Sequence, residues 1–492
     1  MPQATIFQPA AQADPPPSAG SSLIGALLRH ARERPGAEAV VEMDGSRERW
    51  TYGELALRVA SRARRLRACA APGSVVVALL PSGTEYVAWF CAAIAAGMRL
   101  MPMHTQIAPS EARAAADRAG AAAAIAAPDI PATSALGHLT SIRADRSHED
   151  DAEMPRVEPG GVVLGSSGTT GLPKLVLRDG ASLDADAAGV IHGMGLTPAD
   201  RIAFATPLSH SYGVDVLLGA LTAGATLLTS AGFDADAVAA ELNAGATVLP
   251  AVPFILEALA RRAPAASTRP RLVLSAGSSL PPRVRREFVG AWGVEPGQLY
   301  GATELGTVAM SLPGSDDFDP ACIGRPLPGV SVRVVDVDDP SRTLGTDAQG
   351  HLAVRAPSML SAYLDGEVPT VDGHFLTGDL ARIDPQGRIW ISGRLKMLID
   401  VGAYKVNPLE VESVLADHPA VAECVVVPLT ASETVQRLRA MVVPRDAARP
   451  PSSRQLRAFL SERLSAVKVP RVIDIVGSLP RSPAGKVIRV WA

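Results

Sequence analysis

The chain has 492 residues, enough for about three domains at roughly 150 residues each. Lysine and arginine number 47, and aspartate and glutamate number 50. The resulting net charge of −3 argues against a nucleic-acid-binding protein, which normally carries a basic surface. With 47% hydrophobic and 20% charged residues, the composition is typical of a soluble globular protein.

Targeting and membrane signals are weak. Residues 1–20 lack the basic and apolar regions of a signal peptide and contain a run of prolines, so we expect a disordered leader. The longest apolar run, Tyr86–Met98, is too short to span a bilayer.

No two of the four cysteines are close enough for a CxxC pair, which argues against a zinc site or a disulfide framework and indicates the cytoplasm. They are Cys69, Cys91, Cys322 and Cys424.

The first half of the chain alternates strand and helix signals. Asp44-Gly45-Ser46 predicts a hairpin, and Thr51 with Glu54 forms a capping-box pattern that begins a helix reaching about Arg67. Ser110 is expected to cap a further helix. Buried strands are expected over Ser74–Leu80, Ala121–Ala126, Ala225–Leu228, Thr247–Val252 and Arg271–Ser275. This alternation predicts an α/β fold with doubly wound parallel sheets.

The pattern changes in the second half. From Val330 to Ile391, short runs separated by Asp-Pro and glycine are typical of antiparallel β structure. Asn407 is expected to cap a helix that begins at Pro408, and a second helix begins near Ser453. We therefore expect a large N-terminal domain over 21–393 with two βαβ-type sheets and a β-barrel-like subdomain. A small α+β C-terminal domain is expected over 394–492.

The most informative segment is the loop from Gly165 to Lys174, which reads Gly-Ser-Ser-Gly-Thr-Thr-Gly-Leu-Pro-Lys and follows the apolar strand Gly161–Leu164. Its glycines allow tight turns that gather N–H groups, its hydroxyls add donors, and Lys174 adds a positive charge, which together suit a polyphosphate. The Gly-Lys-Ser/Thr of a P-loop is missing. The residues alone also fit a flexible surface linker.

This loop resembles the signature of the adenylate-forming (ANL) superfamily, which includes acyl- and aryl-CoA synthetases, adenylation domains of peptide synthetases, and luciferases. Further motifs of the superfamily follow in order from Pro207 to Lys486. They are Pro207 to Gly213, Tyr300 to Glu304, Cys322 to Gly329, Thr377 to Leu380, Gly393 to Lys396 and Pro480 to Lys486. The resemblance implies an AMP-forming acid–thiol ligase that uses ATP and Mg²⁺ to make an acyl-adenylate, releases pyrophosphate, and transfers the acyl group to a thiol. It also implies that the small C-terminal domain is a mobile lid.

The resemblance assigns roles to residues that, taken singly, also fit ordinary structural roles. The implied catalytic residues are Lys486, Thr303, Glu304 and His210, of which Glu304 also holds Mg²⁺. The implied ATP or AMP contacts are Ser166, Ser167, Gly168, Thr169, Thr170, Lys174, Gly277, Tyr300, Gly301, Asp379 and Arg394. The acyl pocket is implied to include Tyr212, Ala276, Gly301 and Ala302. Lys396 is the implied hinge, and Gly402 and Ala403 are implied to line the thiol tunnel.

Three functions stay open on the sequence. The first is an acyl- or aryl-CoA ligase, because His210-Ser211-Tyr212 resembles that subgroup, although Asp215 keeps an amino-acid substrate open. The second is a stand-alone enzyme that loads the phosphopantetheine of a separate carrier protein. The third is an ATP-binding regulatory homologue without activity. The presence of Lys486, Glu304 and Asp379 argues against the third.

The role implied for Lys486 gives a first prediction. Lys486→Ala should greatly slow adenylate formation, because a mobile cation suited to the in-line transfer is lost. Thioester formation from supplied acyl-adenylate should stay nearly intact. Assaying the two half-reactions separately checks this, and an equal loss of both would mean misfolding or a wrong assignment.

Overall fold

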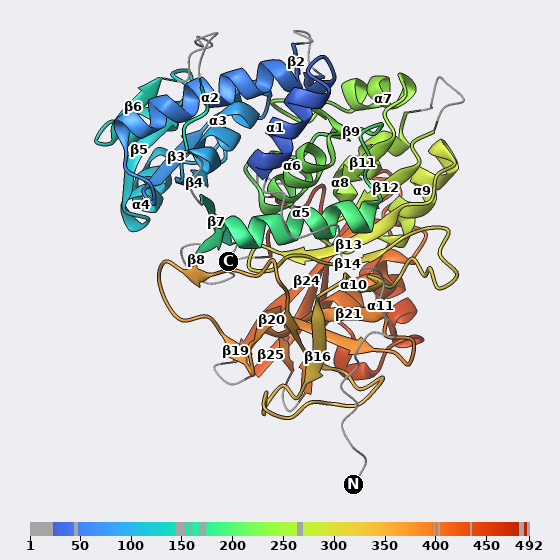
Figure 1. Cartoon of the computed structure of the whole chain (residues 1–492). Helices are drawn as coiled ribbons and strands as arrows, with labels where there is room; N and C mark the ends of the chain where they lie inside the picture. The colour runs from blue at the N-terminus through green and yellow to red at the C-terminus, as the bar shows by residue number, and fades with distance from the viewer. Residues whose placement is uncertain are drawn as a thin grey trace. The chain divides into compact units, whose positions relative to one another are not determined.

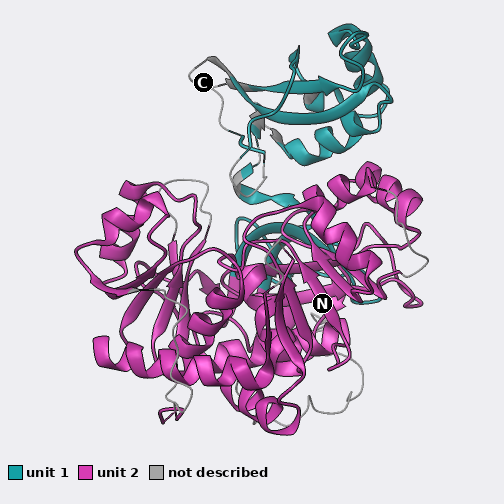
Figure 2. Ribbon diagram, turned by 90° about the horizontal axis from the view of Figure 1, so that it is seen from above, with its two compact units in different colours: residues 1–5, 333–353, 376–492 teal, residues 6–332, 354–375 magenta. Residues whose placement is uncertain are grey.

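The computed structural model describes residues 23–43, 48–143, 153–156, 160–166, 174–262, 269–397, 399–401, 404–432, 435–481 and 487–489. The chain divides into two compact units (Figure 2). Unit 2 consists of residues 6–332 and 354–375, and unit 1 of residues 1–5, 333–353 and 376–492. The expected leader and the turn Asp44-Gly45-Ser46 lie outside the described residues, and the expected domain boundary at residue 393 stays a prediction.

The first sheet of unit 2 is mostly parallel (Figure 1). In the described part of the chain it has seven strands in the order β18-β8-β7-β4-β3-β5-β6. The strands are β3 (Val75–Leu79), β4 (Arg99–Pro102), β5 (Ala121–Ala126), β6 (Thr140–Arg143), β7 (Gly161–Ser166), β8 (Lys174–Asp179) and β18 (Ala362–Tyr363). The pairs from β7 to β6 are parallel, whereas β8 and β18 add antiparallel. β3 is buried at every position, as expected for a central strand of a sheet covered on both faces.

The second sheet of unit 2 has nine strands among the described residues, in the order β15-β14-β13-β12-β11-β9-β10-β1-β2. They are β1 (Glu38–Glu42), β2 (Arg49–Thr51), β9 (Arg201–Phe204), β10 (Thr226–Thr229), β11 (Val248–Ala251), β12 (Leu272–Ser275), β13 (Gly297–Ala302), β14 (Gly306–Ser311) and β15 (Arg325–Pro326). The pairs from β13 to β1 are parallel, and antiparallel strands close both edges. The two mostly parallel sheets confirm the predicted α/β fold class.

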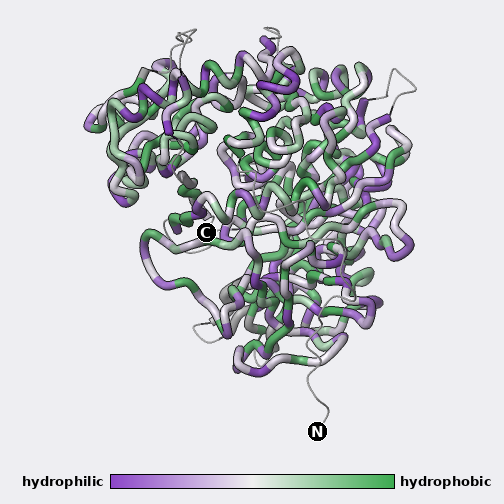
Figure 3. The backbone as a smooth tube through the Cα atoms, viewed as in Figure 1, coloured by the Kyte–Doolittle hydropathy of each residue, from purple (hydrophilic) through white to green (hydrophobic). Residues whose placement is uncertain are grey.

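Helices accompany both sheets. They are α1 (Leu23–Glu33), α2 (Tyr52–Cys69), α3 (Thr84–Ala95), α4 (Pro109–Arg118), α5 (Gly180–Met194), α6 (Ser211–Ala223), α7 (Ala235–Asn243), α8 (Pro253–Ala260) and α9 (Pro282–Trp292), with the 3₁₀ turn η1 (Pro131–Leu136). Hydrophilic and hydrophobic residues alternate along α2 (Figure 3). Its middle is buried over a full turn, at Val59, Ala60, Ser61, Arg62 and Ala63.

Helix starts follow the capping residues. The predicted capping box of α2 is confirmed, since Thr51 and Glu54 each bind the other's backbone N–H. The prediction that Ser110 caps a helix was wrong. Ala108 is the N-cap of α4 and Pro109 occupies the first helical turn, where its fixed φ and missing N–H cost nothing.

A third sheet, with five strands in the part of the chain that the structure describes, has the order β16-β17-β20-β19 with β21 beside β20. These are β16 (Ser331–Val335), β17 (Gly350–Arg355), β19 (Thr370–Val371), β20 (His374–Ile383) and β21 (Ile389–Arg394). The pairs β19–β20 and β20–β21 are antiparallel, as the punctuated sequence of this region predicts.

The last part of unit 1 is the predicted α+β pattern. Its elements are η2 (Leu395–Met397), β22 (Ile399–Val401), β23 (Tyr404–Val406), α10 (Pro408–Ala416), β24 (Val421–Ser432), β25 (Val435–Pro444), α11 (Ser453–Ser461), η3 (Ala466–Lys468) and β26 (Val472–Ile475). Asn407 caps α10 as predicted, since its side chain accepts the N–H of Leu409. A core that includes Val411, Leu456 and Ile473 joins the helices to the sheet.

An ion cluster lies inside unit 2. Arg178 of β8 is fully buried and donates to Asp186 of α5 at 2.6 Å and to Asp215 of α6 at 3.0 Å. Burial opposes the ionised form of Asp186, but Arg178 outweighs it and lowers the pKa of Asp186. Burial and the neighbouring Asp186 raise the pKa of Asp215 well above its usual value. The two carboxyl groups therefore differ in the direction of their pKa shifts, although both contact the same guanidinium.

Removing the guanidinium should be costly. Arg178→Met leaves the carboxyl groups of Asp186 and Asp215 buried without a cation, so we expect a loss of about 3–5 kcal/mol in the free energy of unfolding. Urea unfolding followed by tryptophan fluorescence measures this. Arg113→Met is the control, because its ion pair with Asp117 is exposed and should contribute about 0–1 kcal/mol. Equal effects of the two substitutions would contradict the prediction.

Candidate active site

Several predicted site residues of unit 2 gather at one edge of the nine-stranded sheet. β9, β11, β12 and β13 are parallel neighbours, so their carboxyl ends meet there. Open α/β sheets bind ligands at that edge. The residues found at these strand ends or in the connections that follow them are His210, Ala276, Gly277, Tyr300, Gly301, Ala302, Thr303 and Glu304.

Two glycines at this edge are needed by the backbone. Gly277 has a φ of +81°, which strains any other residue. A Cβ on Gly301 would lie 2.5 Å from the carbonyl oxygen of Gly306, so a side chain there would push β13 away from β14. Gly301 is exposed, whereas Ala276 is buried.

His210 has an aromatic neighbour that the sequence did not indicate. It occupies the N-cap of α6, and the ring of His104 lies 5.7 Å away between centroids. Nδ1 of His104 accepts the N–H of Gln106, and burial lowers the pKa of His104, which favours the neutral ring. Tyr212 is half-buried and packs edge-on against Phe204 at 5.6 Å.

Glu304 and Lys174 meet at one side chain that the sequence did not single out. The hydroxyl of Tyr363 donates to Oε1 of Glu304 at 3.0 Å. The ammonium of Lys174 lies 4.3 Å from the centroid of the Tyr363 ring, a distance suited to a cation–π interaction. Burial and the Glu304 charge raise the pKa of Tyr363, so it stays a hydrogen-bond donor.

The ends of the predicted phosphate loop are fixed. Ser166 and Lys174 are paired across the β7–β8 ladder, with Ser166 buried and Lys174 exposed. Ser167, Gly168, Thr169 and Thr170 lie outside the described residues.

The donor set around Glu304 suits Mg²⁺. The carboxylate is half-buried, and Oε1 is engaged by Tyr363. Mg²⁺ commonly takes one or two carboxylates and completes its shell with phosphate oxygens and water. The described residues contain no group of three or more His, Cys, Asp or Glu side chains that could hold a metal ion by themselves. An ion at Glu304 would therefore need the phosphates of ATP as ligands.

Two predicted ribose contacts lie together in unit 1. Asp379 and Arg394 face each other across the β20–β21 ladder, and Nε of Arg394 lies 2.8 Å from Oδ1 of Asp379. His351, which the sequence analysis missed, accepts the N–H of Gly378 at 2.8 Å. Burial lowers the pKa of His351, which preserves the lone pair for this contact.

The other predicted residues of unit 1 are only partly described. The backbone of Lys396 lies in η2, but its side chain is outside the described atoms. Gly402, Ala403 and Lys486 also lie outside the described residues. Arg481 and Val487, which are described, pair in an antiparallel bridge.

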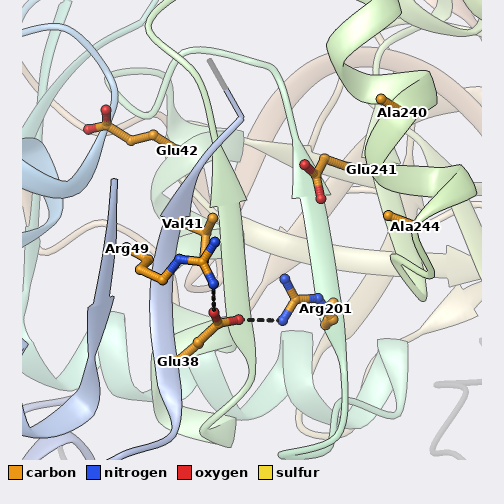
Figure 4. A pocket seen from close by; sticks show the side chains of 8 residues that line it. All are labelled: Glu38, Val41, Glu42, Arg49, Arg201, Ala240, Glu241 and Ala244. Carbon is orange, nitrogen blue, oxygen red and sulfur yellow. Dashed lines mark hydrogen bonds and ion pairs between the residues drawn. The ribbon is translucent and has the colours of Figure 1, made fainter. Parts of the chain in front are cut away.

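A cavity elsewhere in unit 2 holds none of the predicted site residues. Its volume is about 210 Å³, and β1, β2, β9 and α7 contribute its side chains (Figure 4). Glu38 accepts from Arg49 at 3.1 Å and from Arg201 at 2.6 Å. Glu38 is thus paired with two cations, and the two ion pairs link β1 to β2 and to β9.

Family comparisons identify the chain. The profile of the AMP-binding enzyme family matches residues 27–364, and that of the AMP-binding enzyme C-terminal domain matches residues 410–486. The chain belongs to the AMP-binding enzyme family. The predicted superfamily and the prediction of an AMP-forming acid–thiol ligase are thereby confirmed. No described helix of this AMP-binding enzyme is both long and apolar enough to cross a membrane.

Relatives of this AMP-binding enzyme are named for ligases. 4-Coumarate–CoA ligase 1 of Oryza sativa subsp. japonica is 27% identical over 487 residues, 89% of this chain and 86% of that one. Probable CoA ligase CCL8 of Humulus lupulus is 28% identical, and the alignment covers 66% of this chain and 60% of that one. Fatty acid–[acyl-carrier-protein] ligase ScoC of Streptomyces coeruleorubidus is 29% identical across 66% and 65% of the two chains. The ATP-bound structure of MatB from Rhodopseudomonas palustris superposes with a TM-score of 0.87 at 26% identity, covering 95% of this chain and 97% of that one.

Lys174 gives a prediction for this site. Lys174→Ala should raise the KM for ATP by about tenfold or less, because backbone N–H groups share the phosphate load. Adenylate formation at varied ATP measures it. Lys468→Ala is the control, since this lysine is paired with Glu410 in unit 1. An unchanged KM in Lys174→Ala would contradict the phosphate-loop interpretation.

Proposed function

We propose that the protein activates a small carboxylic acid with ATP and Mg²⁺, releases pyrophosphate, and transfers the acyl group from the adenylate to coenzyme A. The observation that carries this proposal is the arrangement of Lys174 and Glu304 around Tyr363. Attack of a carboxylate on the α-phosphate brings two anions together. Such a reaction needs positive charge near the phosphates. Lys174 would supply one cation to the phosphate oxygens, and Glu304 would hold Mg²⁺ as a second.

Other residues keep the roles that the family resemblance implies. Tyr300 would stack on adenine, and Thr303 would contact the α-phosphate. In unit 1, Asp379 and Arg394 would bind the ribose hydroxyls, and their ion pair already orients the carboxylate. Lys486 would supply the cation for the in-line transfer. Lys396 would act as the hinge, with Gly402 and Ala403 on the path of the thiol.

The acid is proposed to be an aryl or medium-chain acyl acid. An amino-acid substrate needs a carboxylate for its ammonium group, and Asp215 was the candidate for that contact. Asp215 is buried and already paired with Arg178, which argues against this role. His210, His104 and Tyr212 instead offer ring surfaces that suit an apolar or aromatic group. The relative named for 4-coumarate supports the aryl choice.

CoA is the favoured acceptor because the similarity to enzymes named CoA ligases extends over most of the chain. A separate carrier protein is the second candidate, since one relative is named for ligation to an acyl-carrier protein. Both acceptors present the same phosphopantetheine thiol, so an experiment must separate them.

A two-stage assay tests the proposal. Pyrophosphate release is measured across aryl, medium-chain, dicarboxylic and amino acids, and thioester formation is then measured with CoA and with a phosphopantetheinylated carrier. We expect turnover with aryl or medium-chain acids, none with amino acids, and thioester on CoA. Thioester on the carrier alone would favour the second candidate, and no pyrophosphate release from any acid would favour the regulatory homologue.

A further inference from the structure

A short segment bonds to the turn that carries Glu304. Residues Ala356–Asp365, here called the strap, follow β17 and include β18. The N–H of Leu360 donates to the carbonyl oxygen of Glu304 at 2.7 Å. The hydroxyl of Ser358 donates to the carbonyl oxygen of Leu305 at 2.6 Å. The strap therefore holds the backbone of Glu304 and Leu305 in place.

The same strap bonds to the strand that begins with Lys174. The N–H of Ser361 donates to the carbonyl oxygen of Leu177, and the N–H of Leu364 donates to that of Leu175, both at 2.9 Å. These contacts extend the β18–β8 pairing, in which Tyr363 lies opposite Val176. One segment thus joins the end of the phosphate loop to the turn with the carboxylate.

Tyr363 is the point of the strap where the two charges meet. Its side chain is buried, with 7% of the residue exposed, yet its hydroxyl contacts a carboxylate and its ring face contacts an ammonium. Lys174 and Glu304 form no direct ion pair among the described residues. The Tyr363 side chain therefore contacts the Glu304 carboxylate and the Lys174 ammonium at the same time, while these two groups form no ion pair with each other.

This arrangement leaves both groups able to bind a ligand. One oxygen of Glu304 accepts from Tyr363, so the other oxygen can face a metal ion. A π face attracts an ammonium but accepts no strong hydrogen bond, so Lys174 keeps its N–H donors for phosphate oxygens. A direct ion pair between Lys174 and Glu304 would have to break before either could bind.

We propose that Tyr363 is a positioning residue for adenylation, whose hydroxyl orients Glu304 toward Mg²⁺ and whose ring holds Lys174 ready for the phosphates of ATP. The inference rests on the proposed function, because it uses the roles given there to Glu304 and Lys174. The two contacts use different parts of one side chain, so two substitutions can separate them.

Binding experiments on the full chain test this. Calorimetry with a non-hydrolysable ATP analogue, repeated at several Mg²⁺ concentrations and without Mg²⁺, gives the Mg²⁺ requirement and the Mg²⁺-free affinity. Tyr363→Phe removes only the hydroxyl, so the Mg²⁺ concentration for half-maximal binding should rise about tenfold, as expected for a charge-assisted hydrogen bond. Its Mg²⁺-free affinity should change by less than about twofold. Tyr363→Leu removes the ring as well, so its Mg²⁺-free affinity should also fall.

Double substitutions connect each contact to its partner. In Glu304→Gln, adding Tyr363→Phe should raise the Mg²⁺ requirement little further, because the hydroxyl acts through that carboxylate. In Lys174→Ala, adding Tyr363→Leu should lower the Mg²⁺-free affinity little further. Tyr52→Phe is the matched control, since the buried Tyr52 hydroxyl donates to the carbonyl oxygen of Ala225 at 2.8 Å, far in sequence from the site. It should lower stability and leave the Mg²⁺ requirement unchanged.

The outcomes separate this inference from the proposed function. If Tyr363→Phe loses stability as Tyr52→Phe does and keeps the wild-type Mg²⁺ requirement, Tyr363 is only structural and the inference is overturned. If the unmodified protein does not bind the analogue with Mg²⁺, or if Glu304→Gln keeps the wild-type Mg²⁺ requirement, the proposed function itself fails. The inference then falls with it.

Discussion

The buried guanidinium of Arg178 is the constraint on which the geometry of unit 2 depends. Arg178 belongs to β8 in the seven-stranded sheet, whereas its partners Asp186 and Asp215 lie on α5 and α6, which follow β8 and β9. Desolvating these charges is expensive, and the cost is offset only when the ion contacts and hydrogen bonds are well formed. Few relative positions of the strand and the two helices satisfy that condition. The cluster therefore fixes the strand that begins with Lys174.

The turn that carries Glu304 is held by contacts with the same ion cluster of Arg178 and Asp186. Oδ1 of Asp186 accepts the N–H of Thr307 at 2.9 Å. A Cβ on Gly306 would lie 2.8 Å from both Nη2 of Arg178 and Oδ1 of Asp186, and its φ is +66°, so the backbone approaches the ions as only glycine allows. Lys174 and Glu304 come from different sheets, yet each is one short stretch of backbone away from one ion cluster. The strap then needs to span only the remaining distance between them.

The features that could be predicted from the sequence are those that depend on neighbouring residues. Capping residues such as Thr51 and Asn407 act on backbone groups within three residues, so their helix starts could be predicted, and the alternation of strands and helices predicted the α/β class. Ser110 failed because a proline one residue earlier was a stronger start signal. The ordered motifs predicted Lys174, Glu304, Asp379 and Arg394 as site residues, but they gave no distances between them.

The missed residues are those that act at long range. Tyr363 is 59 residues from Glu304, and His351 is 27 residues from Gly378. Nothing around a tyrosine in Ser361-Ala362-Tyr363 marks it as the neighbour of a carboxylate, because that contact arises only when β18 adds to β8. Asp215 shows the converse case. Its sequence position suggested an ammonium partner, whereas in the fold it pairs with Arg178. The sequence pattern around Asp215 does not indicate which distant residue will be its partner.

Two of the predicted nucleotide-binding cations are already held by the protein, but with different strengths. Arg394 pairs with the buried carboxylate of Asp379, and its own side chain is 52% exposed. This ion pair holds the Asp379 carboxylate in one orientation, which suits the ribose contact proposed for it. Lys174 lies over a π face, and an exposed cation–π contact is worth only about 0.5–1 kcal/mol. A phosphate oxygen can replace it at little cost, so the ammonium is placed in advance yet remains free to transfer. The near-zero net charge of the chain is then no obstacle to binding ATP, because each cation is fixed locally by a partner matched to its task.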